Sequence, residues 1–222
     1  MNILAIETAT DYCSVALMQK NGNQTEYTVY GKGVHSEAVF LGIKEVLEKT
    51  GFPASQVDAV LLSGGPGSYT GLRVGYSAVK GFLFGHNTRL YIVDTMLSVA
   101  AAVSAMVPNT ADIHIVLDAR RNHLIHQMFK QTDGLLTVAS GTQIVPVGEI
   151  GGFLKPGDVL AGTGIERIES ESLKELQVFN DIPVKAAYLF MVWKMQVLNP
   201  AAPLIREADP ESAEPVYLTP GV

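Results

Sequence analysis

A glycine-rich segment, residues 64–71, is the part of the sequence best suited to bind an anion. It follows an apolar run, residues 57–63, that is typical of a buried parallel strand, and it leads into a segment with helical spacing. Free N–H groups at a helix start suit an anion. The segment lacks the Gly-Lys-Ser/Thr of a Walker A loop and has Thr70 where a Gly-x-Gly-x-x-Gly loop has its third glycine. We therefore expect a tight turn in which Ser68 or Thr70 caps the helix.

Nucleophilic and metal chemistry find little support in the sequence. Ser68 is a poor nucleophile candidate because its neighbours do not form a Gly-x-Ser-x-Gly arrangement and no motif ties a histidine to it. His123 and His126 are three residues apart on a predicted strand, so they point to opposite faces and cannot share an ion. The sequence thus predicts no catalytic residue, no metal site and no cofactor.

The elements that must position these residues follow from apolar periodicity and from the turn and cap residues. Ser36 is expected to cap the first helix and Gly51 to end it. The predicted elements of the first half are strands at 2–8, 13–19 and 25–30, a helix at 36–50, a strand at 57–63, a helix at 71–86, a strand at 90–93 and a helix at 96–107.

The predicted helix at 71–86 carries its smallest side chains on one face. Gly71, Gly75, Ala78, Gly81 and Gly85 recur at steps of three or four residues. An interior glycine costs a helix about 1 kcal/mol relative to alanine, so the stripe is a liability unless another element approaches closely. We expect one side of the helix to face its own sheet and the other to face a second helix, from this chain or another protein.

The strand pattern occurs twice. Residues 3–31 and 114–142 share a layout of three strands and two turns at an offset of 111, which places Glu7 on Asp118. This repeat indicates a gene duplication.

The duplication predicts an N-terminal lobe at residues 1–108 and a smaller C-terminal lobe at 109–222. The tail, residues 200–222, contains five prolines and is expected to lie extended on the surface.

Composition limits the class of protein. The chain has 222 residues, is 47% hydrophobic and carries a formal net charge of −6, which argues against gripping nucleic acid through its own phosphate contacts. Cys13 is the single cysteine, so no intrachain disulfide is possible. No signal peptide or apolar run of about 18 residues is present. We expect a soluble protein of the reducing cytoplasm that does not contact a membrane.

The glycine-rich segment, residues 64–73, and the opening residues 1–11 resemble the TsaB family, also called YeaZ, a bacterial subunit of the tRNA threonylcarbamoyladenosine machinery. Three further motifs are similar to that family and stand in its order: His35-Ser36-Glu37, Leu117-Asp118-Ala119-Arg120 and Pro215-Val216-Tyr217-Leu218. The family pattern usually has Asp in place of Glu7, Gly in place of Asn122 and Arg in place of Thr219.

The resemblance implies the duplicated α/β fold of actin, Hsp70 and sugar kinases, with mixed sheets flanked by helices and a reduced C-terminal lobe. Members of that superfamily place acids that face magnesium and phosphates at strand ends, which makes Glu7 and Asp118, together with Gly162 and Gly164, candidate nucleotide-adjacent residues. The turns after both acids contain no glycine, so side chains occupy the space that a triphosphate needs. We expect the two acids to cap their turns instead.

The catalytic paralogue of the family, TsaD, has a His-x-x-x-His metal motif on its first helix. This chain has His35 but carries Val39 at the second position, and one ligand does not hold a metal. His35 is therefore expected to play a polar or packing role at the start of the helix.

The resemblance implies a non-catalytic scaffold that binds and activates TsaD, helps to recruit the ATPase TsaE and meets tRNA only through the complex. The two helices would pair with equivalent helices of TsaD, and the chain alone would form a homodimer. The alternative is an independent ATPase or small-molecule kinase of the actin-like superfamily. The expected partner interface comprises Phe40, Ile43, Leu47, Gly71, Gly75, Ala78, Gly81, Phe82 and Gly85.

Overall fold

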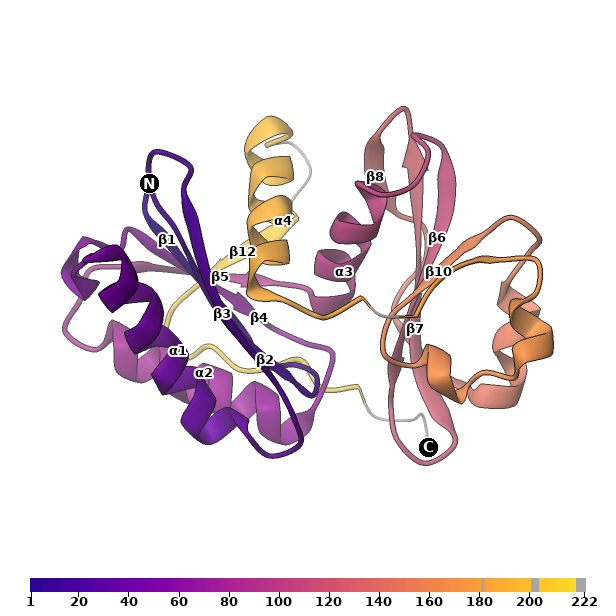
Figure 1. Ribbon diagram of the computed structural model, residues 1–222, viewed down its shortest axis with the longest axis horizontal. Coiled ribbons are helices and arrows are strands. Elements are labelled where there is room, and N and C mark those ends of the chain that lie inside the picture. The colour runs from indigo at the N-terminus through magenta and orange to yellow at the C-terminus, as the bar shows by residue number, and fades with distance from the viewer. Residues whose placement is uncertain (181, 201–203, 219–222) are drawn as a thin grey trace. The chain divides into compact units, whose positions relative to one another are not determined.

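The computed structural model describes residues 1–180, 182–200 and 204–218; Thr219 lies outside these ranges. The chain forms two compact units, Met1–Thr95 with Val184–Tyr217, and Met96–Pro183 with Leu218 (Figure 1). This division differs from the predicted boundary between residues 108 and 109. The chain leaves the first unit earlier, and it later returns to add a helix and a strand to the first sheet.

The first unit contains a six-stranded mixed sheet in the order β12-β5-β4-β1-β2-β3. Its elements are β1 (Ile3–Glu7), β2 (Tyr12–Met18), β3 (Gln24–Tyr30), α1 (His35–Thr50), the 3-10 turn η1 (Ala54–Gln56), β4 (Ala59–Ser63), α2 (Tyr69–Leu83), β5 (Arg89–Val93), α4 (Ala186–Leu198) and β12 (Ile205–Ala208). Helix α3 (Thr95–Ser104) begins where this unit ends.

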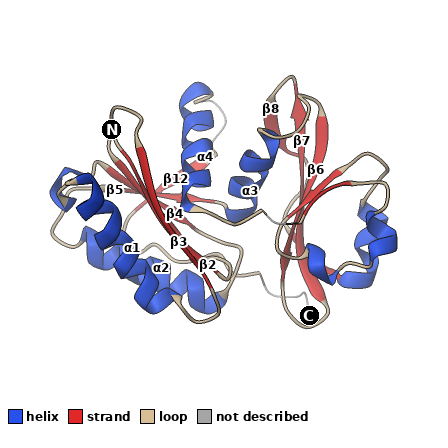
Figure 2. Cartoon of the chain, in the orientation of Figure 1, coloured by secondary structure: helices blue, strands red, loops and turns tan. Residues whose placement is uncertain are grey.

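Helices α1 and α2 lie side by side on one face of the first sheet, and α4 packs on the other face (Figure 2). The core between the sheet and the helix pair is aliphatic, with Leu4 and Leu62 from the strands packed together with Val39 and Val79 from the helices. Burial of these stripes fixes which helix faces remain outside.

The second unit repeats this strand order in a sheet β11-β10-β6-β7-β8, with β9 also paired to β7. Its elements are β6 (Ala111–Asp118), β7 (His123–Thr132), β8 (Leu135–Val138), β9 (Gln143–Pro146), η2 (Val147–Phe153), β10 (Val159–Ala161), η3 (Ile165–Arg167), η4 (Ser170–Leu173) and β11 (Gln177–Phe179). In both units an antiparallel three-strand meander is extended by a parallel strand, so the predicted duplicated α/β fold is confirmed.

The sequence predicted the N-terminal cap of α2 correctly but not that of α1. Ser68 caps α2 as expected, because its Oγ accepts a hydrogen bond from the N–H of Gly71 at 3.2 Å. Ser36 does not cap α1; the helix already begins at His35, and Val34 occupies the cap position without a side-chain hydrogen bond. Gly51 ends α1 in the left-handed conformation, as predicted.

The tail is more ordered than its prolines indicated. Residues Ile205–Ala208 form β12, which pairs antiparallel with β5 in a register that places Ile205 opposite Val93. A sheet edge with free N–H and C=O groups accepts such a strand even from a proline-rich segment when the prolines lie outside the pairing. These four residues are extended and partly or fully exposed, as predicted, but their hydrogen bonding to β5 was not predicted.

Candidate functional site

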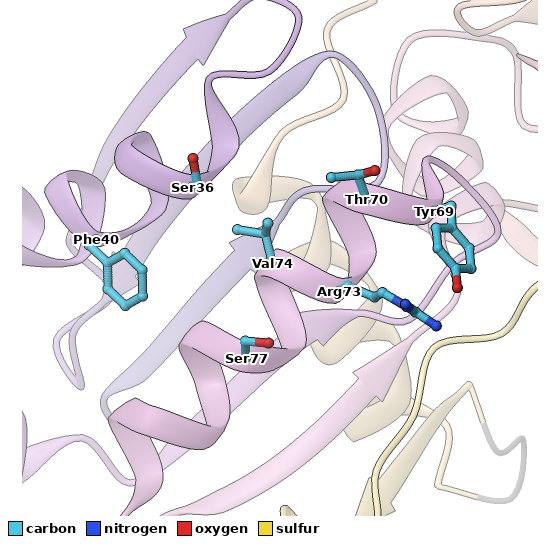
Figure 3. Close-up of a pocket in the computed structure, with 7 residues that line it drawn as sticks. All are labelled: Ser36, Phe40, Tyr69, Thr70, Arg73, Val74 and Ser77. Carbon is cyan, nitrogen blue, oxygen red and sulfur yellow. The ribbon is translucent and has the colours of Figure 1, made fainter.

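A groove of about 400 Å³ lies between the outer faces of α1 and α2. Phe40 and Val74 project into the space between the helices, whereas Tyr69 and Arg73 lie toward the other side of α2 (Figure 3). The groove is lined by Ser36 and Phe40 from α1 and by Tyr69, Thr70, Arg73, Val74 and Ser77 from α2. Phe40 is 56% exposed and Tyr69 is 54% exposed, so two large aromatic side chains face solvent here.

Arg73 is held between two tyrosines at one edge of this groove. Its guanidinium carbon lies 4.0 Å from the ring centroid of Tyr69, and its Nε donates a hydrogen bond to the hydroxyl of Tyr217 at 3.0 Å. The centroids of the two tyrosine rings are 4.7 Å apart. Stacking of this kind keeps the cation in place while leaving it exposed.

The segment that carries Tyr217 runs along α2 and the glycine-rich loop. The N–H of Val216 donates to the carbonyl of Gly64 at 2.9 Å, and Lys80 Nζ donates to the carbonyl of Glu211 at 3.0 Å. Tyr217 therefore forms part of the groove edge. Sequence reasoning linked it to the family pattern but not to Arg73.

Two of the glycines predicted to face a partner face this chain instead. A Cβ on Gly71 would lie 2.1 Å from the carbonyl oxygen of Thr8, and a Cβ on Gly75 would lie 2.3 Å from Thr8 Oγ1. Both glycines are needed because α2 packs directly on the turn after β1. The prediction that they lie in a partner interface is wrong, since the chain's own residues already cover them.

The other predicted interface residues divide into covered and exposed ones. Ile43 and Ala78 are buried in the core, so the prediction that they lie on the interface surface is wrong. Leu47 and Phe82 are half-buried and pack against the core. Phe40 and Gly81 are exposed, and a Cβ on Gly81 would meet open space.

Gly85 is also exposed but lies beyond the end of α2, with φ +78°. Gly85 is therefore not part of the small-residue stripe on α2.

Glu7 lies at the end of β1 and is fully buried. Its Oε1 accepts a hydrogen bond from the N–H of Ala9 at 2.6 Å, so it caps the turn as predicted. Burial raises the pKa of Glu7 to about 7, against the smaller lowering effects of hydrogen bonds from Ala9, Ser63 and Thr8. A buried carboxyl of this kind changes its charge near neutral pH.

Asp118 occupies the corresponding position at the end of β6 and caps its turn in the same way, with Oδ1 accepting from the N–H of Arg120 at 2.8 Å. Unlike Glu7, it is exposed and forms an ion pair with Arg167, whose Nη1 lies 2.8 Å from Oδ1. Arg167 also donates to the carbonyl of Arg121, so one guanidinium ties the acid to its turn.

Gly162 and Gly164 pack against the end of β6. A Cβ on Gly162 would lie 2.2 Å from the carbonyl oxygen of Val116, and one on Gly164 would lie 2.7 Å from Leu124 Cδ2. Close packing of the loop on the sheet accounts for both glycines. Their proposed position next to a nucleotide remains a prediction.

His35 serves the polar role expected at the helix start. Its Nε2 lies 2.7 Å from the carbonyl oxygen of Thr10 and 3.2 Å from that of Tyr12, so this nitrogen carries the proton and donates. The side chain is buried. His35 thereby links α1 to the turn between β1 and β2.

A buried histidine pair in the second unit was missed by sequence reasoning. His126 Nε2 lies 2.9 Å from His114 Nδ1, His114 Nε2 lies 3.2 Å from Asp158 Oδ2, and Gln143 Nε2 lies 3.2 Å from His126 Nδ1. Gln143 donates to His126 Nδ1 and His126 Nε2 donates to His114 Nδ1, so both Nδ1 atoms accept and both histidines are neutral. The pairing of β6 with β7 places Val116 opposite His126, which puts both histidines on one face.

The same burial sets the charge of this pair. Burial lowers the pKa of His126 to about 4, with a further lowering from His114, and it lowers the pKa of His114 against the opposing effect of Asp158. Within the described ranges, no three His, Cys, Asp or Glu side chains are arranged to hold a metal ion. None of the helices in the described ranges is long and apolar enough to cross a membrane.

The fold and the site define a class: a duplicated α/β protein whose two strand-end acids cap their own turns and whose first unit exposes a helix-pair groove. Residues 24–210 match the family described as TsaD: tRNA N6-adenosine threonylcarbamoyltransferase, and the chain belongs to this family. The predicted resemblance to TsaB and YeaZ proteins is also confirmed.

Two curated relatives are named tRNA threonylcarbamoyladenosine biosynthesis protein TsaB. The Haemophilus influenzae protein is 31% identical over 124 residues, which are 56% of this chain and 52% of that protein. The Bacillus subtilis protein is 27% identical over 150 residues, 66% of this chain and 60% of that protein. The chain thus spans between about half and three fifths of these relatives. The structure of YeaZ from Pseudomonas aeruginosa has the same fold, with a TM-score of 0.79 at 21% identity, covering 98% of this chain and 99% of that one.

Proposed function

We propose that this chain is a non-catalytic scaffold subunit in the synthesis of N6-threonylcarbamoyladenosine in tRNA, and that it binds and activates TsaD and helps to recruit the ATPase TsaE. The names of the matched family and relatives support the pathway. The groove between α1 and α2 carries the scaffold role, because it exposes Phe40 and Tyr69 beside the cation of Arg73. Exposed apolar surface with a polar edge is typical of protein interfaces.

The turn after β1 supports the absence of catalysis. The carbonyl of Ala9 accepts a hydrogen bond from the N–H of Ser68 at 2.6 Å, and a Cβ on Gly67 would lie 2.2 Å from the same oxygen. The glycine-rich loop therefore lies directly on the turn. No phosphate group fits between the loop and the turn, because their backbones are in direct contact.

The proposed partner is a pair of helices on TsaD, which would complete a four-helix bundle with α1 and α2. On this chain, Phe40 and Gly81 remain in the proposed interface, and Tyr69, Arg73 and Ser77 are added to it. In the absence of TsaD the same apolar groove would pair with a second copy of the chain. Because the net charge is −6, tRNA is held by another subunit of the complex.

The groove is tested by Phe40→Asp and Arg73→Glu, with binding to TsaD measured by isothermal titration calorimetry. We expect each variant to weaken binding by roughly a hundredfold, as aromatic and arginine hot-spot residues do. Leu135→Asp is the matched control, because Leu135 is 51% exposed, close to the 56% of Phe40, but lies on β8 of the second unit. Unchanged affinity in both groove variants would contradict the proposal.

A measurement of ATP hydrolysis distinguishes the scaffold from the alternative, an independent ATPase or kinase. We expect the purified chain alone to hydrolyse ATP no faster than a heat-denatured sample, and the mixture with TsaD, TsaE and tRNA to form the modified nucleoside only when the chain is present. Turnover by the lone chain at roughly 1 s⁻¹ or faster would favour the alternative.

A further inference from the structure

The turn between β1 and β2, residues 8–10, is bound by the starts of both groove helices. On the side of α1, His35 Nε2 donates to the carbonyl of Thr10 at 2.7 Å. On the side of α2, the N–H of Ser68 donates to the carbonyl of Ala9 at 2.6 Å. Two helices that are far apart in sequence therefore attach to adjacent peptide groups of one turn.

These attachments lie next to residues that line the groove. Ser36 follows His35 directly, and Tyr69 and Thr70 follow Ser68. The N-terminal end of the groove is thus built from the first turns of α1 and α2. The distance between these first turns depends on where residues 8–10 hold them.

Packing makes the turn a rigid spacer. Cβ atoms on Gly67 and Gly71 would lie 2.2 and 2.1 Å from the carbonyl oxygens of Ala9 and Thr8, so α2 and its loop have no room to move toward the turn. From inside the sheet, Glu7 Oε1 accepts from the N–H of Ala9 at 2.6 Å. Residues 8–10 are buried, as are Glu7 and His35.

We propose that the turn at residues 8–10 sets the geometry of the partner-binding groove, with His35 and Glu7 as positioning residues that the partner never touches. Glu7 fixes the turn from the sheet, and His35 fixes α1 to it. This inference rests on the proposed function, because it assigns a role to the groove in binding TsaD.

The test compares His35→Ala with His35→Gln in the full chain. The amide nitrogen of glutamine can donate from close to the position of His Nε2, whereas alanine has no donor. We expect His35→Ala to weaken binding to TsaD at least about tenfold and His35→Gln to stay within roughly threefold of the wild type. Binding is measured by isothermal titration calorimetry, with the folded fraction checked by circular dichroism.

A destabilised control separates positioning from general stability. Leu83 is buried at the opposite end of α2, so Leu83→Ala removes core packing without touching the turn. We expect its affinity for TsaD to stay within roughly twofold of the wild type at a temperature where it is folded.

Two results would overturn the inference: wild-type affinity in His35→Ala, or an equal loss of affinity in Leu83→Ala. Loss of binding in the Phe40 and Arg73 variants with normal binding in His35→Ala would refute the positioning role alone. Normal binding in the Phe40 and Arg73 variants would refute the groove itself.

Discussion

The turn after β1 and the turn after β6 occupy corresponding places in the two sheets but have different surroundings. Both begin with a carboxylate that caps the turn, and neither contains glycine. Glu7 is fully buried, whereas the side chain of Asp118 is 39% exposed and paired with Arg167.

The two units differ in the element that comes after their parallel strand. In the first unit β4 leads into the long helix α2, whose Gly71 lets it pack on the turn; in the second unit β10 leads only into the 3-10 turn η3. A long helix therefore packs on the turn after Glu7, and only a short 3-10 turn follows the parallel strand beside Asp118. Substitutions in the two turns and around them can test this contrast, and we expect the strongest response at Gly71.

Gly71→Ala breaks the cover over the first turn. The new Cβ would lie 2.1 Å from the carbonyl oxygen of Thr8, and backbone cannot yield as a flexible side chain does, so we expect a loss of about 3 kcal/mol in the free energy of unfolding. Gly81→Ala is the matched control, because its Cβ meets open space and should stabilise α2 by about 0.5 to 1 kcal/mol. Urea denaturation measures both; equal effects would contradict the close packing of α2 on the turn.

Glu7→Gln tests the buried proton site. The folded pKa of about 7 exceeds the ordinary value of 4.5, so the folded state holds the proton more tightly. The resulting stabilisation is complete below pH 4.5 and is lost as the pH rises through 7, which amounts to about 2 to 3 kcal/mol between pH 5 and 8.

Glutamine mimics the protonated carboxyl, so Glu7→Gln should remove most of this decline in urea denaturation at several pH values. The exposed control Glu37→Gln should retain the decline. A wild-type protein whose stability does not fall toward pH 8 would rule out a proton on Glu7 at neutral pH.

The histidine pair of the second unit should respond in the opposite direction. Because burial lowers the pKa of His126 from 6.5 to about 4, the unfolded state binds more protons and stability is lost as the pH falls through this window. In the Glu7→Gln background, we expect a loss of about 2 kcal/mol between pH 7 and 5. His126→Gln should reduce this loss and the exposed His86→Gln should not; a loss of equal size in both would place the proton elsewhere.

The surface ion pair should matter least. Asp118 and Arg167 are each more than a third exposed, so we expect Asp118→Ala to cost about 1 kcal/mol or less in urea denaturation. Asp118→Asn should cost less still, because the amide oxygen can still accept from the N–H of Arg120. A cost above about 2 kcal/mol would show that the second turn is as strongly coupled to its unit as the first.

The succession of strands and helices along the first half of the chain, the duplication and both capping acids could be predicted from sequence, because alternation, turn residues and strand ends are local signals. The glycine stripe indicated close approach but not what approaches. Thr8 is 63 residues away from Gly71 in the sequence, at the end of another strand. The pairing of His114 with His126 was within reach, since it follows from the register of a predicted hairpin. The strand β12 was not, because its partner is the free edge of β5.

The return of residues Val184–Tyr217 to the first unit has a consequence for synthesis on the ribosome. Most of the second unit, Met96–Pro183, emerges before α4 and β12, which the first unit lacks until that stretch has been made. Domains generally fold as units during translation. The first sheet therefore keeps an unpaired edge at β5 until the chain has been made through β12, long after its other five strands have emerged.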